Sequence, residues 1–439
     1  MKKVLILGAG LVSRPMVRYL LSLPEVEVTV ATRTVKRAQE LLEGAPRGKA
    51  VALLVEDEAA LHRLVADADV VVSLLPYIYH IAVARHCVEL KRHLVTTSYV
   101  SDGMRALNEA AKSAGVLFLN EIGLDPGIDH MSAMAIIDRV NDQGGRVTSF
   151  ISSCGGLPAP EANDNPFGYK FSWSPRGVLM AGRNEARFLK DGKEVVIPST
   201  NLFASFWRLG IPGIGEFEAY PNRNSLPYID LYGLSGIRTM IRATLRYPGW
   251  CETMKAISEL GLIKDDRVRE GIFGLTYAQW LRGLVAEEGD VKSAVARKLG
   301  LPVEHPIINR LEWLGLFADK PIGLERGSDI DILAKAMVEK MSYKPGERDM
   351  IVLNHQFEVE YPGDKKEKIS ATLVDFGMPG GDSAMARTVS LPAAIAVKMI
   401  LEGKIRLTGV QIPVRKEIYQ PVLSELTKLG IEFKEVSEL

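Results

Sequence analysis

The strongest constraint on the fold lies in the first residues, MKKVLILGAGLVSRP. A short apolar run, KVLIL, ends at the glycine pair GAG, and a helical pattern, LVSRPMVRYLLSL, follows it. In such a turn the first glycine permits a tight bend, and the second lets the backbone approach a pyrophosphate. Ser13 stands where a third glycine usually allows close helix–strand packing, and serine is small enough to replace it. The turn predicts dinucleotide contacts from Gly8, Gly10, Leu11 and Val12.

Further apolar runs alternate with helix-like segments through the first third of the chain. They are VEVTVA (26–31), ADVVVSLLP (68–76), HLVTTS (93–98) and VLFLN (116–120). Continuous β-branched runs are typical of buried parallel strands, and strands alternating with helices indicate βαβ units. The sequence therefore predicts an α/β fold that begins with a doubly wound parallel Rossmann sheet over residues 1–125. A Rossmann-like domain that binds no dinucleotide is the alternative.

The end of the second run indicates which dinucleotide binds. An NAD site usually has an acid there to hold the ribose 2′-hydroxyl, whereas this chain has the sequence VATRT and no acid. The planar guanidinium of Arg33 can pair with a 2′-phosphate, and Arg37 adds charge one helical turn later. A solvated arginine at a helix start is the alternative. The pattern favours NADP(H), with NAD(H) possible, and the further contacts that we predict are Thr34, Leu74 and Leu75.

The remainder of the chain predicts a second α/β domain with a helical insertion. Strand and turn signals start at RVTSFISSCGG, and apolar residues take helical spacing between about 249 and 342. Strand-like MIVLNHQFEVEYP and KISATLVDFG follow. We expect the second domain to comprise 126–248 and 343–382, with the inserted α-helical domain at 249–342. The last segment, about 383–439, is expected to pack back onto the first domain.

Charge and cysteine content exclude several classes of function. Lys+Arg and Asp+Glu both number 54, and zero formal net charge argues against nucleic acid or an anionic membrane as the main partner. Three well-separated cysteines, Cys87, Cys154 and Cys251, give no disulfide framework or zinc spacing. Glycines interrupt the N-terminal apolar run, so it is not a clean signal peptide, and no run of about 20 apolar residues predicts a membrane span. We expect a cytoplasmic protein.

The segment NEIGLDPGIDHM, residues 120–131, gathers three acids and a histidine around a Pro-Gly turn. It follows a parallel strand, so it emerges at the edge where open α/β sheets bind ligands. The DPG sequence fits a type II turn, and Asp129 is placed to cap the next helix. Without an HExxH spacing or a cysteine partner no metal site is expected, and His130 should pack or hydrogen-bond. Only its position at this edge suggests that Glu121 lines the pocket. Asp125 therefore remains as the candidate for substrate contact.

A resemblance to one family is carried by the motifs SLLPYIYH, VTTSYVS, NEIGLDPGIDH, SSCGGLPAPEANDNPFGYKFSWSPRGVL, AYPNRNSLPY, ATLRYPGW, EWLGLF and GERDMIVLNHQFE. The chain resembles the saccharopine dehydrogenases of the L-glutamate-forming type along essentially all 439 residues. The resemblance implies a Rossmann domain, a substrate and dimerisation domain with a helical insertion, and a homodimer. It also implies the reversible reaction of saccharopine, NAD(P)⁺ and water to L-glutamate and 2-aminoadipate 6-semialdehyde, in lysine metabolism. Fungal relatives use NADP(H) and the animal half-enzyme uses NAD, and Arg33 matches the fungal pattern.

Saccharopine carries three carboxylates and two amino groups, so its site needs cationic side chains. Family-like loops contain Arg223 and Arg246, which the resemblance makes carboxylate-binding forks, with solvated arginines as the alternative. Thr244 and Leu245 are expected to add hydroxyl or backbone contacts. Weaker cationic candidates are Lys170 and Arg176. Substrate contacts are also implied at the end of the run HLVTT for Ser98 and Tyr99, with a core Ser-Tyr pair as the alternative.

Proton transfer needs a relay, because oxidation requires a neutral secondary amine and water must then attack the imine. The candidates are Asp125, Tyr99 and Cys154, and they stay unranked. Asp125 can equally pair with the substrate ammonium, Cys154 can be a buried structural thiol, and ordered water can carry the proton. Two other functions stay open: an imine reductase similar to carboxynorspermidine dehydrogenase, and a non-catalytic Rossmann protein that senses NADP(H).

Overall fold

The structure is a computed structural model that describes residues 1–438, and it confirms the predicted α/β fold. The chain divides into two compact units. Unit 1 consists of Met1–Val147, Val359–Glu367 and the chain from Ala371 onward, and unit 2 consists of Thr148–Glu358 and Lys368–Ser370.

A parallel sheet forms the centre of unit 1. Its strands are β1 (Lys2–Leu7), β2 (Val26–Thr32), β3 (Gly48–Ala52), β4 (Val70–Ser73), β5 (His93–Thr96), β6 (Leu117–Leu119) and β17 (Gly409–Gln411). They lie in the order β17-β6-β5-β4-β1-β2-β3, and all pairings are parallel. Because the strand order reverses between β1 and β4, the ends of these strands form the switch point where doubly wound sheets bind ligands. The predicted Rossmann sheet is confirmed.

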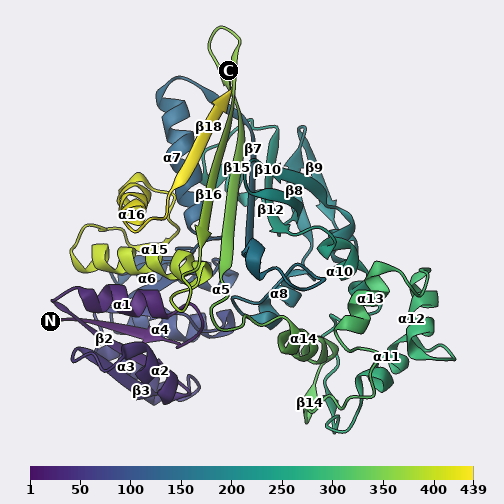
Figure 1. The fold of residues 1–439 in the computed structure, drawn as a ribbon. Helices are drawn as coiled ribbons and strands as arrows, with labels where there is room; N and C mark the ends of the chain where they lie inside the picture. Colours follow the sequence, from purple (N-terminus) through teal and green to yellow (C-terminus); the bar gives the residue numbers. More distant parts are fainter. Residues whose placement is uncertain (439) are drawn as a thin grey trace. The chain divides into compact units, whose positions relative to one another are not determined.

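Helices that alternate with these strands complete unit 1 (Figure 1). They are α1 (Arg14–Ser22), α2 (Val35–Leu42), α3 (Glu58–Ala66), α4 (His80–Glu89), α5 (Asp102–Ala106), α6 (Asn108–Ser113), α7 (Ile128–Asp142), α15 (Ala384–Leu401) and α16 (Lys416–Lys428), with a 3₁₀ turn, η1 (Tyr77–Tyr79). Apolar side chains of β1, β4, β5 and β6 share one buried core with α3 and α4. Strands β4 and β6, the last four residues of β1 and the last three of β5 are buried because helices cover the sheet, which explains their continuous apolar runs.

Helix α15 is the only helix of residues 1–438 whose length and composition suit a membrane span. Its apolar character has another explanation, since 78% of that window is buried within the fold. It packs against α1, α16, β4 and β5, and Figure 1 shows α1 and α15 side by side. A helix that is apolar on all sides is expected where it is surrounded by protein.

The second sheet is mixed and has the order β10-β11-β12-β7-β15-β16-β18, with β8 and β9 attached at β12. Its strands are β7 (Arg146–Pro158), β8 (Ala186–Lys190), β9 (Lys193–Ile197), β10 (Trp207–Ile211), β11 (Gly215–Pro221), β12 (Thr239–Arg246), β15 (Asp349–Tyr361), β16 (Lys365–Phe376) and β18 (Phe433–Glu438). Strand β12 pairs antiparallel with β11 and parallel with β7, and seven of its eight residues are buried. Because β12 has a neighbouring strand on each side, the side chains at its end, including that of Arg246, are buried.

Unit 2 also contains the helices α8 (Pro175–Ala181), α9 (Pro227–Leu231), α10 (Trp250–Glu259), α11 (Tyr277–Val285), α12 (Val291–Leu299), α13 (Pro306–Trp313) and α14 (Asp329–Lys340), the 3₁₀ turns η2 (Pro160–Ala162) and η3 (Ser199–Ala204), and the short pair β13 (Arg269–Glu270) and β14 (Arg326–Gly327). In the sequence, helices α10 to α14 come between β12 and β15, and they share a buried core. Figure 1 shows α11 to α14 beside one another, away from these strands. Helix α11 begins where Thr276 and Gln279 form a capping box, which satisfies backbone amides at the helix start.

Candidate active site

The glycine turn after β1 has the geometry of a pyrophosphate cradle. Gly8 has φ +108°, and a Cβ there would lie 3.1 Å from the Leu74 carbonyl oxygen, so glycine is required. No atom of the described chain lies within 4 Å of a Cβ built on Gly10. The Gly10 amide donates to Ser13 Oγ at 3.0 Å, and the buried serine hydroxyl lies 3.4 Å from the Gly8 carbonyl. The turn is therefore preformed, and its open side can accept a diphosphate.

The other predicted cofactor contacts lie beside this turn. Leu11 is 67% exposed, Val12 is half-buried, and both precede the first turn of α1. Leu74 and Leu75 follow β4, which neighbours β1 in the sheet, and both are half-buried. These positions leave the backbone of all four residues at the ligand-binding edge.

Arg33 and Thr34 follow β2 and are both exposed. Sequence reasoning missed the acid nearby. The Glu56 carboxylate accepts a 2.8 Å hydrogen bond from the Tyr79 hydroxyl. Its own backbone amide and Tyr79 lower the pKa of Glu56, and the positive charge of Arg33 contributes. Arg33 is thus exposed and lies close enough to the Glu56 carboxylate to interact with it electrostatically.

His80 is a buried residue that organises the ends of β4 and β5, and the sequence analysis did not single it out. Its Nδ1 lies 2.8 Å from Ser73 Oγ, and its Nε2 lies 2.8 Å from Ser98 Oγ. Burial lowers the pKa of His80 to about 4, so the ring is neutral at physiological pH. One ring nitrogen then donates and the other accepts, which fixes the hydroxyl of the predicted substrate contact Ser98. Only its place at the end of the SLLPYIYH motif hinted at this role.

This burial of His80 predicts a pH dependence of stability. Between about pH 6.5 and pH 4 the unfolded chain binds a proton at His80 that the folded chain excludes, so stability falls as the pH falls. The contribution amounts to about 3 kcal/mol across this range. Urea unfolding at several pH values should show that His80→Gln, which does not titrate, loses less stability than the wild type on acidification. Parallel curves for the two proteins would contradict this assignment.

Tyr99 and Asp125 lie together at the same edge of the sheet. The Tyr99 hydroxyl donates to Asp125 Oδ1 at 3.2 Å. The loop that carries Tyr99 is tied to the NEIGLDPGIDHM segment, because Glu121 N donates to the Ser98 carbonyl and the Val100 amide donates to Glu121 Oε1. The structure therefore brings together two of the three predicted relay residues and Ser98 on connected loops.

Glu121 and His130 form the support beneath these loops. Both side chains are buried, and His130 Nε2 lies 2.9 Å from Glu121 Oε2. Glu121 has φ +56°, a conformation that non-glycine residues rarely adopt, and its two carboxylate oxygens serve two elements at once. His130 hydrogen-bonds, as expected, and Glu121 has a positioning contact that its sequence position did not reveal.

Two details of this segment were predicted wrongly. The Asp125–Pro126 peptide bond is cis, so the DPG sequence does not form the type II turn expected for a trans proline. Helix α7 begins at Ile128 with Gly127 as its N-cap, so Asp129 lies inside the first turn instead of capping it. Asp129 Oδ1 accepts a 2.6 Å hydrogen bond from the Gly127 amide. The carboxylate still stabilises the helix start, from a position two residues later than a cap.

Arg246, at the end of β12, is the most unusual cation of unit 2. It is only 5% exposed, and its Nη1 donates to the Leu245 carbonyl at 2.7 Å. Its guanidinium lies 4.8 Å from the Tyr169 ring centre and 5.4 Å from that of Trp250. Within residues 1–438 no carboxylate pairs with it, and its Nε has no hydrogen-bond partner. Because a buried charge normally has an ionic partner, this arginine is suited to a carboxylate supplied by a ligand.

The neighbours of Arg246 keep its charge uncompensated. Burial raises the pKa of the Tyr169 and Tyr220 phenols, so both are neutral at physiological pH. Thr244 is half-buried and pairs in register with Cys154 of β7, while Leu245 is fully buried and can contribute only through its backbone. Cys154 is a buried thiol, consistent with the structural alternative.

The remaining cationic candidates differ from Arg246. Arg223 is exposed, has φ +55°, and its carbonyl accepts from the Arg187 amide. Lys170 is buried but forms ion pairs of 2.7 Å with Asp164 and Glu347. Arg176 is exposed and pairs with two acids, at 2.8 and 3.5 Å. The last two are therefore occupied by protein carboxylates, whereas Arg246 is not.

Comparison with known proteins identifies the family. The model of the saccharopine dehydrogenase NADP binding domain matches residues 4–119, and that of the saccharopine dehydrogenase C-terminal domain matches residues 123–431. The chain belongs to the saccharopine dehydrogenase family. The resemblance inferred from the motifs is thus confirmed, and the family's first domain coincides with the strands and the glycine turn described above.

Relatives in this family match the whole chain. A protein of Saccharomyces cerevisiae named saccharopine dehydrogenase [NADP(+), L-glutamate-forming] is 43% identical, with 99% of each chain covered. One of Pyricularia oryzae with the same name is 42% identical, covering 99% of this chain and 98% of the relative. The apo saccharopine dehydrogenase (L-Glu forming) structure from S. cerevisiae has a TM-score of 0.89 at 41% identity, with both chains fully covered. The bovine alpha-aminoadipic semialdehyde synthase is 39% identical, and this chain spans 47% of its length.

Proposed function

We propose that this chain is an NADP(H)-dependent oxidoreductase that interconverts saccharopine with L-glutamate and 2-aminoadipate 6-semialdehyde. The observation that carries the proposal is the full-length identity of 42–43% to fungal proteins named for this reaction. The buried guanidinium of Arg246 supports the proposal, because it has no protein carboxylate as a partner and saccharopine carries three carboxylates. The glycine turn also supports the proposal, because its geometry suits the diphosphate of NADP(H).

The reaction divides into oxidation and hydrolysis. The glycine turn at Gly8 and Gly10, with Arg33, would hold NADP⁺, which would supply a hydride acceptor for the carbon beside the secondary amine. The nitrogen loses its proton as the carbon–nitrogen double bond forms. Water then adds to that carbon, and the bond to nitrogen breaks to give an amine and an aldehyde. The protein must bind carboxylates, keep the amine neutral for oxidation and move protons for the water.

We assign these tasks to residues of each unit. In unit 1, Asp125 with its Tyr99 partner exchanges protons with the amine and the attacking water, and Ser98 contacts the substrate in the orientation that His80 fixes. In unit 2, Arg246 binds a substrate carboxylate, and Thr244 and the Leu245 backbone lie beside it on β12. Arg223 is a second, exposed carboxylate ligand in this proposal.

A direct assay tests the function. The purified protein should reduce NADP⁺ when saccharopine is added, as followed by the absorbance of the reduced nicotinamide. No turnover with NADP⁺ or NAD⁺ would refute the proposal and favour a non-catalytic NADP(H) sensor. Turnover with carboxynorspermidine alone would instead identify an imine reductase of that related type.

Arg33 is predicted to set the choice between the two cofactors. Arg33→Ala should weaken NADP⁺ binding by about tenfold, the value of one charge-assisted hydrogen bond, and leave NAD⁺ use nearly unchanged. The KM values for both cofactors at saturating saccharopine measure this. Arg63→Ala is the matched control, because that arginine is also exposed but lies in α3. Equal losses for both cofactors would show that Arg33 has only a structural role.

We further propose a cytoplasmic homodimer. Support for the location comes from three buried cysteines that form no disulfide and from zero formal net charge. Support for the dimer comes from the family resemblance. Light scattering at micromolar concentration tests the assembly, and a mass equal to one chain would refute it.

A further inference from the structure

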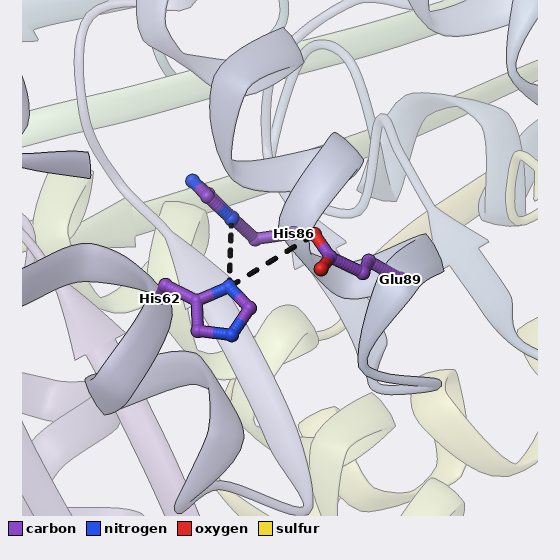
Figure 2. Close-up of side chains that lie close together, drawn as sticks. All are labelled: His62, His86 and Glu89. Carbon is purple, nitrogen blue, oxygen red and sulfur yellow. Dashed lines mark hydrogen bonds and ion pairs between the residues drawn. The ribbon is translucent and has the colours of Figure 1, made fainter. Parts of the chain in front are cut away.

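Outside the candidate active site, unit 1 contains a cluster of three potential metal ligands on two neighbouring helices. His62 belongs to α3, whereas His86 and Glu89 belong to α4 (Figure 2). The Nδ1 atoms of the two histidines are 3.3 Å apart, and His62 Nδ1 lies 3.9 Å from Glu89 Oε2. One ligand atom from each residue can be chosen so that all three lie within 4.8 Å of one another. Helices α3 and α4 therefore place two imidazole nitrogens and one carboxylate oxygen close together.

The spacing of these atoms matches the coordination shell of a small divalent ion. Zinc–nitrogen bonds are about 2.0–2.1 Å long, so two imidazole nitrogens of a tetrahedral site are roughly 3.3–3.4 Å apart. The two Nδ1 atoms already have this separation. The imidazole rings are nearly perpendicular, with an interplanar angle of 76°, so each ring can direct its lone pair without stacking against the other. The Glu89 carboxylate oxygen, 3.9 Å from His62 Nδ1, supplies the third donor of the set.

Access and rigidity also suit an ion. Both histidines are half-buried, and the Glu89 side chain is 66% exposed, so an ion can enter from solvent and keep at least one water. The helices that carry the ligands pack against each other and contribute to the apolar core of unit 1. His86 and Glu89 are three residues apart on α4, a spacing that places both side chains on the same helix face.

We propose that His62, His86 and Glu89 bind one divalent transition-metal ion, with Zn²⁺ as the best-suited ion. Two imidazoles and one carboxylate without a thiolate are a typical set for zinc, with water in the fourth position. The site is separate from the cofactor edge, because α4 starts there at His80 and runs toward the opposite edge, where Glu89 ends it. The ion would link α3 to α4 and stabilise unit 1, since a ligand that binds only the folded state shifts the unfolding equilibrium.

The test uses the full-length protein without an affinity tag and without nucleotide. Calorimetric titration with ZnCl₂ should give one ion per chain, and the melting temperature should rise with added Zn²⁺. His62→Gln and His86→Gln should each weaken binding by more than tenfold, because even the loss of groups that support metal ligands costs about 10- to 100-fold. Co²⁺ should give the visible absorption of a tetrahedral site in the wild type and in neither glutamine variant.

Two variants keep the test decisive. His305→Asn is the matched control: this histidine is also half-buried, it caps α13, and asparagine preserves the cap, so binding should be unchanged. His62→Cys should retain binding and add a thiolate band to the Co²⁺ spectrum, which a misfolded variant would not do. The absence of saturable binding in the wild type would overturn the proposal and leave a hydrogen-bonded histidine pair. Wild-type affinity in both glutamine variants would overturn it as well and indicate binding elsewhere on the chain.

Discussion

Asp125→Asn should lower kcat for saccharopine oxidation by about 10²- to 10⁴-fold, the usual contribution of a positioned acid or base. Asparagine keeps the shape of the side chain and an oxygen that can accept the hydrogen bond of Tyr99, but it can no longer take up a proton. The expected loss therefore falls on kcat, and the KM for saccharopine should change little. Steady-state kinetics with saturating NADP⁺ measures both constants.

Two further variants separate the roles open to Asp125. Asp102→Asn is the matched control, because this carboxylate is exposed in the first turn of α5 and should leave kcat unchanged. Tyr99→Phe should also reduce kcat if the tyrosine hydroxyl belongs to the relay. A higher KM with an unaltered kcat in Asp125→Asn would contradict proton transfer and assign Asp125 to the substrate ammonium instead.

Arg246→Met should raise the KM for saccharopine by about 10- to 100-fold, because one charge-assisted pair with a carboxylate is lost. Methionine fills most of the space between the Tyr169 and Trp250 rings, so the apolar contacts are largely kept. Removal of an uncompensated buried charge should also stabilise the free protein. The variant is therefore expected to melt at a higher temperature while it binds substrate more weakly.

This combination of effects distinguishes a binding group from a structural one. Arg176→Met removes an exposed, ion-paired arginine of the same unit. It should change neither the KM for saccharopine nor the melting temperature. Arg246→Lys keeps the charge but loses the planar fork, and its KM should lie between those of the wild type and Arg246→Met. An Arg246→Met protein with normal KM, or one that melts at a lower temperature, would contradict the assignment.

Much of the parallel sheet could be predicted because burial and strand pairing act on the same residues. The runs that became β1, β4, β5 and β6 are apolar on both faces, which is the signature of a sheet covered by helices, whereas β2 alternates buried valines with half-buried Glu27 and Thr29. Strand β3, with the sequence GKAVA, lies at the edge and is only partly buried, so its composition gave no comparable signal. Strand β17 has three residues, too few for any periodicity.

The candidate site was less predictable because its order comes from contacts between distant loops. The glycine turn could be located, since only glycine accepts φ +108° beside the Leu74 carbonyl. His80 could not, because its two serine partners come from the ends of different strands. Asp129 was misplaced by two positions, since the helix start depends on Gly127. Equally, no sequence pattern shows that Arg246 lacks a carboxylate partner, because that depends on what every other segment brings to it.

The position of β17 has a consequence for how this protein is made. Its backbone completes the nucleotide-binding sheet by pairing with β6, yet it comes from near the end of the chain. During synthesis the ribosome releases the first six strands long before their last neighbour exists. Until β17 has been synthesised, β6 is an edge strand whose backbone groups have no β17 partner. Unpaired edges of this kind can pair with other strands, and chaperones bind such surfaces. The nucleotide-binding sheet of this chain therefore cannot be completed until β17 has been synthesised.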